Sequence, residues 1–462
     1  MESLNLYFSR LNIYCSEVIL KKFLALLLSF IFLLPVVGLF PAAAIDEDSA
    51  SYLNFTDELT LYASSCYLVS LDTGRVVYEY NANERVAPAS TTKIMSAALA
   101  LSLTDDPSTT IVTLPEDLWA EFNGIDISHA GLSGNEELTM EQLVHCMLLQ
   151  SANEAASGVA SYFGRESFIE MMNQKAKSLG CTNTNFTNPH GLYDPNHYTS
   201  AKDLYLITKW ALTVPGFYEI VQKSRYEIPE TNKNYEKMLV TSLQMQDSSK
   251  RYYTSYIKGV KTGTLDESGR CLVSTAEKNN MRFCLVLLGC PLENNNVFWE
   301  DGSSVYSETR IIYDWMFANS SIKEVVTKEI IVTQIPVNYS SKKDNLVLYS
   351  GGSLSALLNR NNKVAPKLTY DLDIPESIDA PIEKGQKIGT AKVYADDIYI
   401  GDISLVSFED VDFNWFLFAM AKAWSALTSR ISLIIIGSVI ALFLLYFLYL
   451  LLIVRGAKKR NR

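Results

Sequence analysis

Histidine is scarce in this chain, with four residues in 462, and no Cys-x-x-Cys pair accompanies it. His129, His145, His190 and His197 do not form the His-Glu-x-x-His pattern, in which two imidazoles share one face of a helix and bind zinc. We therefore interpret the histidines as structural residues of loops and helices. The sequence predicts neither a metal site nor a cofactor.

Positive charge is also in deficit. Forty lysines and arginines stand against 51 aspartates and glutamates, which gives a net charge of −11. A broad basic surface, the electrostatic footprint of nucleic-acid binding, is therefore not expected, and we expect no nucleic-acid partner. The acidity is consistent with the solubility of an exported domain.

The seven cysteines do not follow a metal-binding spacing. Cys15 lies in the N-terminal leader, and most of the others lie in apolar runs such as 283–286. We interpret these six as small core residues. Two of them could form a disulfide in an exported protein, but their spacing does not select a pair. The six are Cys66, Cys146, Cys181, Cys271, Cys284 and Cys290.

The N-terminus has the pattern of an export signal. Lys21 and Lys22 precede an apolar run over 23–40, and the alanines at 42–44 offer a cleavage site. We predict a signal peptide over 1–44, followed by a polar linker over 45–60. The stretch before Lys21 is long for such a signal, so either translation starts downstream of Met1 or the segment stays uncut as an anchor.

The C-terminus carries a longer apolar run. Residues 431–454 contain no charge, and as a helix they would measure about 36 Å, enough to cross a hydrocarbon core of about 30 Å. A buried core helix of that length rarely lacks a polar face. Basic residues follow in 455–462, and positive residues stay on the cytoplasmic side. We predict a single C-terminal span in the cell membrane, a cytoplasmic tail, and an extracytoplasmic location for everything before Ile431.

The segment 409–430 precedes this span and has apolar residues at helical spacing. Because Trp415 and Trp424 lie beside the span, one interpretation is an interfacial helix along the lipid bilayer. The other is a short helix packed against the neighbouring domain. The apolar positions are Phe413, Phe416, Leu417, Met420, Trp424 and Leu427.

The region 61–318 begins with strands, continues with helices and returns to strands. A hairpin is predicted over 66–80, a capping box at 139–142 opens a helix, and strand-like runs return between 256 and 289. This order favours an α+β fold in which helices flank an antiparallel sheet. Residues 319–408 change to short strands broken by Asn, Gly, Ser and Pro, which predicts a small all-β domain that serves as a spacer.

The first chemical motif is Ser90-Thr91-Thr92-Lys93, at the predicted start of a helix. Residues three apart share a helix face, so Lys93 can reach the Ser90 hydroxyl. Backbone N–H groups at a helix start would stabilise a developing oxyanion. Burial and a second cation, Lys261, would lower the pKa of Lys93 and let it act as a base. A helix-capping serine beside a solvated lysine is the structural alternative.

The second motif, Ser151-Ala152-Asn153, follows a predicted helix end, so its side chains can point into a cleft. Ser151 could relay a proton between Lys93 and a leaving amine. Asn153 could donate a hydrogen bond to a substrate amide. Capping of the next helix explains the same residues equally well.

The third motif, Lys261-Thr262-Gly263-Thr264, ends a strand-like run. A lysine and hydroxyls on a strand suit a free carboxylate, and Gly263 would let a substrate backbone lie alongside. A lysine that protects an edge strand from aggregation is the alternative. Together the three motifs supply a nucleophile, a base, a proton shuttle and a carboxylate anchor. A serine acyl-transferase without histidine needs this set.

The three motifs resemble the set found in penicillin-binding proteins and class A β-lactamases. Residues 66–317 are similar to the low-molecular-weight penicillin-binding proteins, the D-alanyl-D-alanine carboxypeptidases of serine peptidase family S11. The β-rich region to 408 resembles the second domain of that family. Supporting stretches are 71–79, 88–95, 188–192, 197–204, 259–264 and 269–272.

The resemblance implies a penicillin-binding-protein fold and removal of the terminal D-alanine from peptidoglycan stem pentapeptides in cell-wall maturation, with β-lactams as inhibitors. It implies Ser90 as the acylated nucleophile and Lys93 as its base, with Ser151 and Asn153 completing the centre. The Lys261 side chain and the Thr262 and Thr264 hydroxyls would hold the terminal carboxylate. The backbone amides of Ser90 and Thr264 would form the oxyanion hole.

Two features depart from the family pattern. The segment 232–256 lacks the usual Asn-rich, Leu-Leu pattern, and a full span stands where family members commonly have an amphipathic anchor. A D,D-endopeptidase remains an alternative, as does a β-lactamase, although no Glu-x-x-Leu-Asn stretch follows Asn153. A catalytically silent wall-binding protein is a third, but it would have no reason to keep Ser90, Lys93 and Lys261.

Overall fold

The computed structural model describes residues 61–292, 304–361 and 364–460. The predicted signal peptide and linker lie outside the described residues, as does the end of the basic tail.

A five-stranded antiparallel sheet organises the first region, as predicted. Its strand order is β2-β1-β9-β8-β7, so the first strands pair with the last ones along the chain. The strands predicted from the sequence are all present. Their bounds are β1 (Ser65–Ser70), β2 (Val76–Tyr80), β7 (Ile257–Leu265), β8 (Gly269–Lys278) and β9 (Met281–Cys290).

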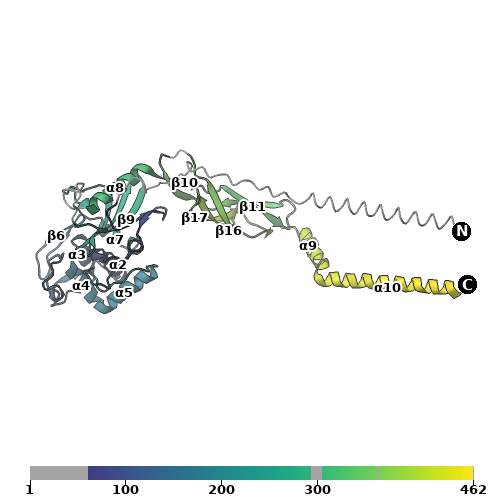
Figure 1. Ribbon diagram of the computed structural model, residues 1–462, viewed down its shortest axis with the longest axis horizontal. Coiled ribbons are helices and arrows are strands. Elements are labelled where there is room, and N and C mark those ends of the chain that lie inside the picture. Colours follow the sequence, from purple (N-terminus) through teal and green to yellow (C-terminus); the bar gives the residue numbers. More distant parts are fainter. Residues whose placement is uncertain (1–60, 293–303, 362–363, 461–462) are drawn as a thin grey trace. The chain divides into compact units, whose positions relative to one another are not determined.

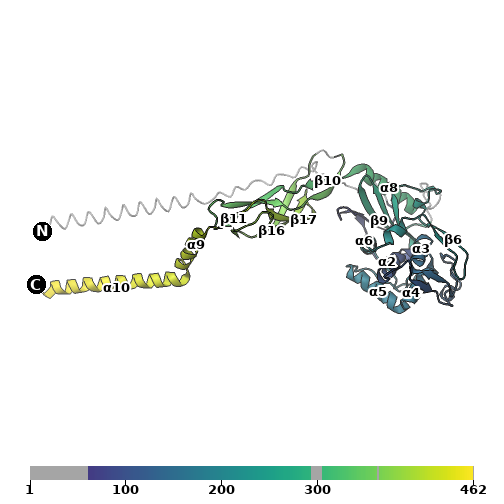
Figure 2. The same cartoon turned by 180° about the vertical axis from the view of Figure 1, so that it is seen from behind.

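Both faces of this sheet are buried. Successive side chains of a strand point to opposite sides, so each strand contributes to a core on either face. On β1, Tyr67 and Val69 pack into one hydrophobic core, whereas Cys66 and Leu68 pack into another. We call these sides the helical face and the α8 face, since α8 (Ser304–Asn319) covers the second (Figure 1, Figure 2). The helical face is covered by α2 (Lys93–Leu103), α3 (Met140–Leu149), α4 (Asn153–Tyr162), α5 (Arg165–Ser178), α6 (Ala201–Ala211) and α7 (Phe217–Val221).

Local sequence explains where several helices begin. The predicted capping box is present at α3, where Thr139 Oγ1 accepts from Gln142 N at 3.2 Å and Gln142 Oε1 accepts from Thr139 N at 2.7 Å. The helix predicted from Ser90 begins three residues later. A 3₁₀ turn, η2 (Ala89–Thr92), precedes it, because the chain enters through Ala89 in the left-handed region with φ of 50°.

Short elements connect the main ones in this region. They are β3 (Ile111–Thr113), η3 (Ala120–Phe122), β4 (Glu137–Thr139), β5 (Arg225–Ile228), β6 (Lys237–Val240) and η4 (Gln244–Gln246).

The second region is all-β, as predicted. A six-stranded sheet has the order β14-β16-β17-β12-β11-β15, and β10 pairs with β13. Its separate core includes Val326, Leu346, Leu348, Val393 and Leu405. The bounds are β10 (Ser320–Val326), β11 (Ile331–Asn338), β12 (Asn345–Ser350), β13 (Leu354–Asn359), β14 (Leu368–Asp373), β15 (Ile378–Asp379), β16 (Lys387–Ala395) and β17 (Ile398–Ser407).

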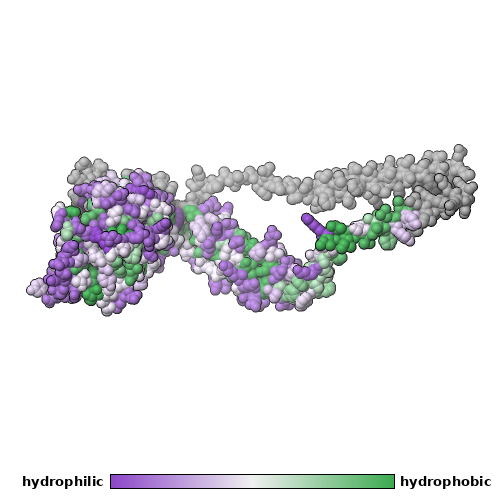
Figure 3. Space-filling view, turned by 90° about the horizontal axis from the view of Figure 1, so that it is seen from below, coloured by the Kyte–Doolittle hydropathy of each residue, from purple (hydrophilic) through white to green (hydrophobic). Residues whose placement is uncertain are grey.

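Two helices follow, α9 (Trp415–Leu427) and α10 (Arg430–Arg460). Within α10, the segment Arg430–Tyr449 has a mean hydropathy of 2.8 and is long and apolar enough to cross a membrane. Asn414 caps α9 by accepting from Phe416 N at 3.0 Å. No residue of α9 is buried, and Figure 3 shows the apolar surface of this C-terminal part.

Candidate active site

Ser90 and Lys93 lie where the turn η2 passes into α2. The Lys93 Nζ lies 3.0 Å from Ser90 Oγ, and it donates to Asn153 Oδ1 at 2.6 Å and to the His190 carbonyl oxygen at 2.7 Å. Lys93 is completely buried in spite of its charge-bearing end. Two fixed acceptors, Asn153 Oδ1 and the His190 carbonyl oxygen, therefore hold the amine against the serine hydroxyl.

Burial lowers the pKa of Lys93 well below its ordinary value of 10.5. The positive charge of Lys261 lowers this pKa further, while Glu154 acts in the opposite direction. The direction expected from the sequence is therefore confirmed. A buried amine that is neutral and in contact with a hydroxyl can take its proton.

Ser151 and Asn153 lie in the connection between α3 and α4. Asn153 is the first residue of α4 and contributes no capping bond, since its Oδ1 accepts from Lys93. Ser151 is buried, and its backbone lies in the left-handed region with φ of 60°. A serine rarely adopts this conformation, which is found at functional sites. Within the described part of the chain, no hydrogen bond joins the Ser151 side chain to Lys93 or Lys261.

Lys261 lies on the edge strand β7, opposite Val273 of β8. Val273 belongs to the core of the helical face, and directly paired residues share a face, so Lys261 points to the side where Lys93 lies. Its Nζ donates to the Thr262 carbonyl oxygen at 3.0 Å. Burial lowers the pKa of Lys261 to about 7.

Thr262 and Thr264 occupy the other face of β7. Thr262 is opposite Leu272, a residue of the α8-face core, and Thr264 is opposite Arg270. The Thr262 Oγ1 lies 3.1 Å from Ser242 Oγ. The lysine of the third motif thus lies on one face of the sheet, and its two hydroxyls lie on the other.

Gly263 packs closely against the turn that carries the nucleophile. A Cβ at this position would lie 2.9 Å from the Ala89 Cβ and 3.1 Å from Ser90 N. The missing side chain therefore lets β7 pack against the turn that carries the nucleophile. Gly191, with φ of 90°, approaches the Ala89 carbonyl oxygen in the same way.

Sequence reasoning missed two contributors to the site. His190 provides its backbone carbonyl, and its ring lies 3.4 Å from the Glu121 carboxylate, which pairs with Arg165 at 2.6 Å. Ser242 binds Thr262, and its own N–H donates to the Leu149 carbonyl oxygen at 2.7 Å, at the end of α3. A backbone acceptor and a lone serine leave no motif, so only the fold reveals them.

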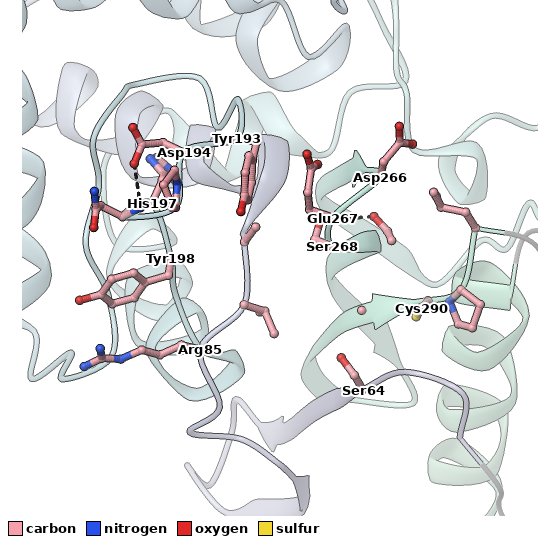
Figure 4. A pocket seen from close by; sticks show the side chains of 18 residues that line it. Ser64, Arg85, Tyr193, Asp194, His197, Tyr198, Asp266, Glu267, Ser268 and Cys290 are labelled. Carbon is pink, nitrogen blue, oxygen red and sulfur yellow. Dashed lines mark hydrogen bonds between the residues drawn. The ribbon is translucent and has the colours of Figure 1, made fainter.

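A polar pocket adjoins the nucleophile turn, because Val86 and Ala87 line it. Figure 4 shows Tyr193, Asp194 and His197 on one side, and Asp266, Glu267 and Ser268 from the β7–β8 turn on the other. The guanidinium of Arg85, at its rim, lies over the Tyr198 ring at 4.5 Å. Carboxylates outnumber basic groups in this pocket.

The cysteines and histidines have structural positions. All six described cysteines are thiols, and only Cys181 is not buried. His197 Nδ1 accepts from Thr187 N at 3.0 Å, and its Nε2 lies 2.9 Å from Thr92 Oγ1. In the residues that the structure describes, no group of three or more His, Cys, Asp or Glu side chains could hold a metal ion.

Both regions match models of known protein families. A family model described as D-alanyl-D-alanine carboxypeptidase, peptidase S11, matches residues 53–291, and one described as penicillin-binding protein 5, C-terminal domain, matches residues 321–412. D-alanyl-D-alanine carboxypeptidase DacF of Bacillus subtilis is 29% identical over 403 residues, which cover 85% of this chain and 95% of the relative. DacC of Escherichia coli is 28% identical over 76% of this chain and 84% of its own.

A solved structure shows the same fold. Penicillin binding protein 5 from Haemophilus influenzae is 26% identical and superposes with a TM-score of 0.61 over 77% of this chain and 98% of its own.

Proposed function

Because this chain belongs to the D-alanyl-D-alanine carboxypeptidase family of serine peptidases, S11, we propose that it removes the terminal D-alanine from peptidoglycan stem peptides through an acyl-enzyme on Ser90. The observation that carries the proposal is the contact of the buried Lys93 amine with Ser90 Oγ at 3.0 Å. A serine at an active centre without histidine needs such a base.

In the acylation step, Ser90 Oγ attacks the carbonyl carbon between the two D-alanines. Neutral Lys93 takes the hydroxyl proton, and the backbone N–H groups of Ser90 and Thr264 stabilise the oxyanion. The carbon–nitrogen bond then breaks, and the proton passes through Ser151 to the leaving amine of D-alanine. Water cleaves the ester in the second step, with Lys93 and Ser151 again moving the proton.

The remaining site residues orient the substrate. Asn153, beside Lys93, donates from its amide nitrogen to the carbonyl of the acyl group, because its Oδ1 is already occupied. Thr262 and Thr264 donate their hydroxyls to the terminal carboxylate. Lys261 adds positive potential near this end of the cleft and keeps Lys93 neutral. Gly263 keeps β7 close to the nucleophile.

The second half of the chain supports a location at the membrane. We propose that 61–318 is the catalytic domain, 319–408 the spacer domain, and 409–430 an interfacial segment before the span 431–454 and the cytoplasmic tail 455–462. The apolar surface of α10 and the exposed tryptophans Trp415 and Trp424 support attachment to a lipid bilayer. The signal peptide 1–44 would bring the catalytic domain to the extracytoplasmic side.

The proposal is tested with the purified protein and a pentapeptide that ends in D-Ala-D-Ala. We expect stoichiometric release of D-alanine, and labelled penicillin should form a stable adduct with the parent but none with Ser90→Ala. The β-lactam carboxylate occupies the Thr262 site, and the opened ring blocks the approach of water. Without a dedicated carboxylate base, hydrolysis of the adduct should be slow.

Two outcomes would contradict this function. Rapid turnover of penicillin without a detectable adduct would favour a β-lactamase. Cleavage of cross-linked dimers in preference to pentapeptides would favour a D,D-endopeptidase.

A further inference from the structure

We propose that Glu154 is a positioning residue of the active site: its buried carboxylate holds the loop 123–136 on the start of α4 and balances the positive charge that Lys93 gains during acylation. The inference rests on the proposed function, and it names a residue that none of the three motifs contains. It follows from the contacts of the Glu154 side chain and from the charges around Lys93.

Glu154 connects the second motif to the loop. It lies in the first turn of α4, next to Asn153, and α4 lies beside α2 and α3 (Figure 1). Its side chain is completely buried, and its Oε1 accepts from Ala130 N at 2.7 Å and from Leu132 N at 3.4 Å. The Asn153 N–H donates to the Ser128 carbonyl oxygen at 2.9 Å. The start of α4 therefore holds the loop through both main chain and side chain.

The tether alone does not require a charge at this position. Glu154 Oε2 is buried and has no hydrogen-bond partner among the described residues. A buried charge costs free energy unless another group compensates it. A glutamine could accept the same two bonds through its amide oxygen without carrying a charge. The charge of Glu154 therefore points to a second role.

Lys93 needs a negative counter-charge in the acylation step. When its neutral amine takes the proton of the Ser90 hydroxyl, a completely buried ammonium forms, and the positive charge of Lys261 opposes it. Among the described residues, the Glu154 carboxylate acts in the opposite direction and raises the pKa of Lys93. A base whose protonated form is stabilised takes a proton more readily, so Glu154 assists the transfer.

Other titratable groups near Lys93 do not supply this negative charge. Lys261 is a cation when it is charged. Burial lowers the pKa of His190, and it lowers that of His197 to about 3, so both rings are neutral near pH 7.

Two titratable groups face Glu154 itself: His129 of the loop and Cys146 on α3. Burial raises the pKa of the Cys146 thiol, which keeps it neutral. Burial also raises the pKa of Glu154, but the loop N–H donors and the positive charge of His129 oppose the rise. These groups therefore favour the ionised carboxylate.

Glu136 tethers the other end of the same loop and serves as the matched comparison. It is completely buried, and it accepts from Ser133 N at 2.7 Å, from Asn234 Nδ2 at 2.6 Å and from Thr231 Oγ1 at 2.8 Å. Both of its oxygens thus have partners, and its charge is not among those that shift the pKa of Lys93.

The test measures the acylation rate of the full-length protein with labelled penicillin between pH 5 and about pH 10, the range in which lysine and neighbouring groups titrate. Glu154→Gln keeps an acceptor for the loop and removes the charge. Because the pKa of Lys93 then falls, the acidic limb of the pH–rate profile should move to lower pH. The plateau should fall about 10-fold, a part of what a general base contributes. Glu136→Gln should leave both as in the parent.

A double variant brings the limb into easy range. Lys261→Met alone should move the acidic limb to higher pH, because it removes the cation that lowers the pKa of Lys93. Adding Glu154→Gln should move the limb back toward lower pH. A role confined to structure would lower the rate without this opposite pair of shifts.

Glu154→Ala removes the tether as well as the charge. The N–H groups of Ala130 and Leu132 lose their acceptor, so amide hydrogen exchange in the loop should be faster than in the parent. Glu154→Gln should keep the parental exchange. Should Glu154→Gln not fold, Glu154→Asp keeps the charge on a shorter side chain; it should speed exchange in the loop and leave the acidic limb close to its parental position.

The outcomes separate this proposal from the proposed function. An unshifted limb in a folded Glu154→Gln protein, or an equal shift in Glu136→Gln, would overturn the charge role while the enzyme remains a carboxypeptidase. Unchanged exchange of the loop in Glu154→Ala would overturn the tether. A parent protein that releases no D-alanine and takes up no penicillin would overturn the proposed function and this inference with it.

Discussion

Asn153 Oδ1 accepts a hydrogen bond from Lys93 Nζ at 2.6 Å, the shortest of the three polar contacts that this amine makes. The bond joins the first residue of α4 to the first residue of α2. It fixes the direction of the amine relative to Ser90. The Lys93 amine is thus fixed between the first residues of two helices and does not move freely in solvent.

Lys93→Arg should abolish acylation without unfolding the protein. A guanidinium stays protonated at any accessible pH, so it cannot take the proton of Ser90. We expect the rate of labelled-penicillin uptake to fall by at least about 100-fold, the lower range for loss of a general base. Thermal denaturation of the same samples provides the control for folding. A variant that acylates at close to the parent rate would mean that Lys93 is not the base.

The pH dependence of acylation should report on Lys261. Acylation needs neutral Lys93, so the rate should rise with pH through the pKa of Lys93 and then level off. Because the charge of Lys261 lowers that pKa, Lys261→Met should raise it and move the acidic limb to higher pH. The measurement is the penicillin acylation rate between pH 5 and about pH 10, the range in which lysine and neighbouring groups titrate. An acidic limb at the parental position would show that the two lysines are not coupled.

Lys261 should also affect stability, in a window given by its pKa. Its folded-state value of about 7 is below its ordinary 10.5, so between these pH values the unfolded chain binds more protons than the folded one. Stability therefore rises with pH across this window, by at most about 1.4 kcal/mol per pH unit for one group. The free energy of unfolding in urea should rise less steeply with pH in Lys261→Met than in the parent. Parallel slopes would contradict the low pKa.

Gly263→Ala should separate β7 from the nucleophile turn. The added methyl would lie 2.9 Å from the Ala89 Cβ, so either the strand or the turn must shift. We expect a loss of about 1–3 kcal/mol in stability, as for overpacking, together with a marked loss of acylation. Gly352→Ala is the matched control, because its methyl would meet no atom within 4 Å. Equal acylation by the two variants would argue against the packing role of Gly263.

Catalysis should be separable from membrane attachment. A chain shortened to residues 45–412 lacks α9 and α10, so it should stay in the soluble fraction while the full-length protein sediments with membranes. Its kcat/KM on a small peptide should match that of the full-length protein, since all the site residues come from 61–292. A folded but inactive short chain would show that the C-terminal helices shape the site.

Local patterns predicted much of this molecule, and packing determined the rest. The capping box at Thr139 and the strands around Lys261 could be predicted because their signals lie within a few residues. The α-helix α2 begins at Lys93 rather than at Ser90, and the alanine side chain of Ala89 gives no sign of the unusual φ that precedes it. The roles of Gly263 and Ser242 depend on residues more than 15 positions away, and no periodicity encodes them.

The pairing of β1 with β9 has a consequence for biogenesis. A chain that emerges N-terminus first presents Ser90 and Lys93 early, but the sheet cannot close until β9, which ends at Cys290, has followed. Such long-range pairing makes folding slow, and the nascent intermediate exposes unpaired strand edges. The strand that carries Lys261 pairs with β8, and β8 pairs with β9, so the site is complete only when the last strand has joined the first.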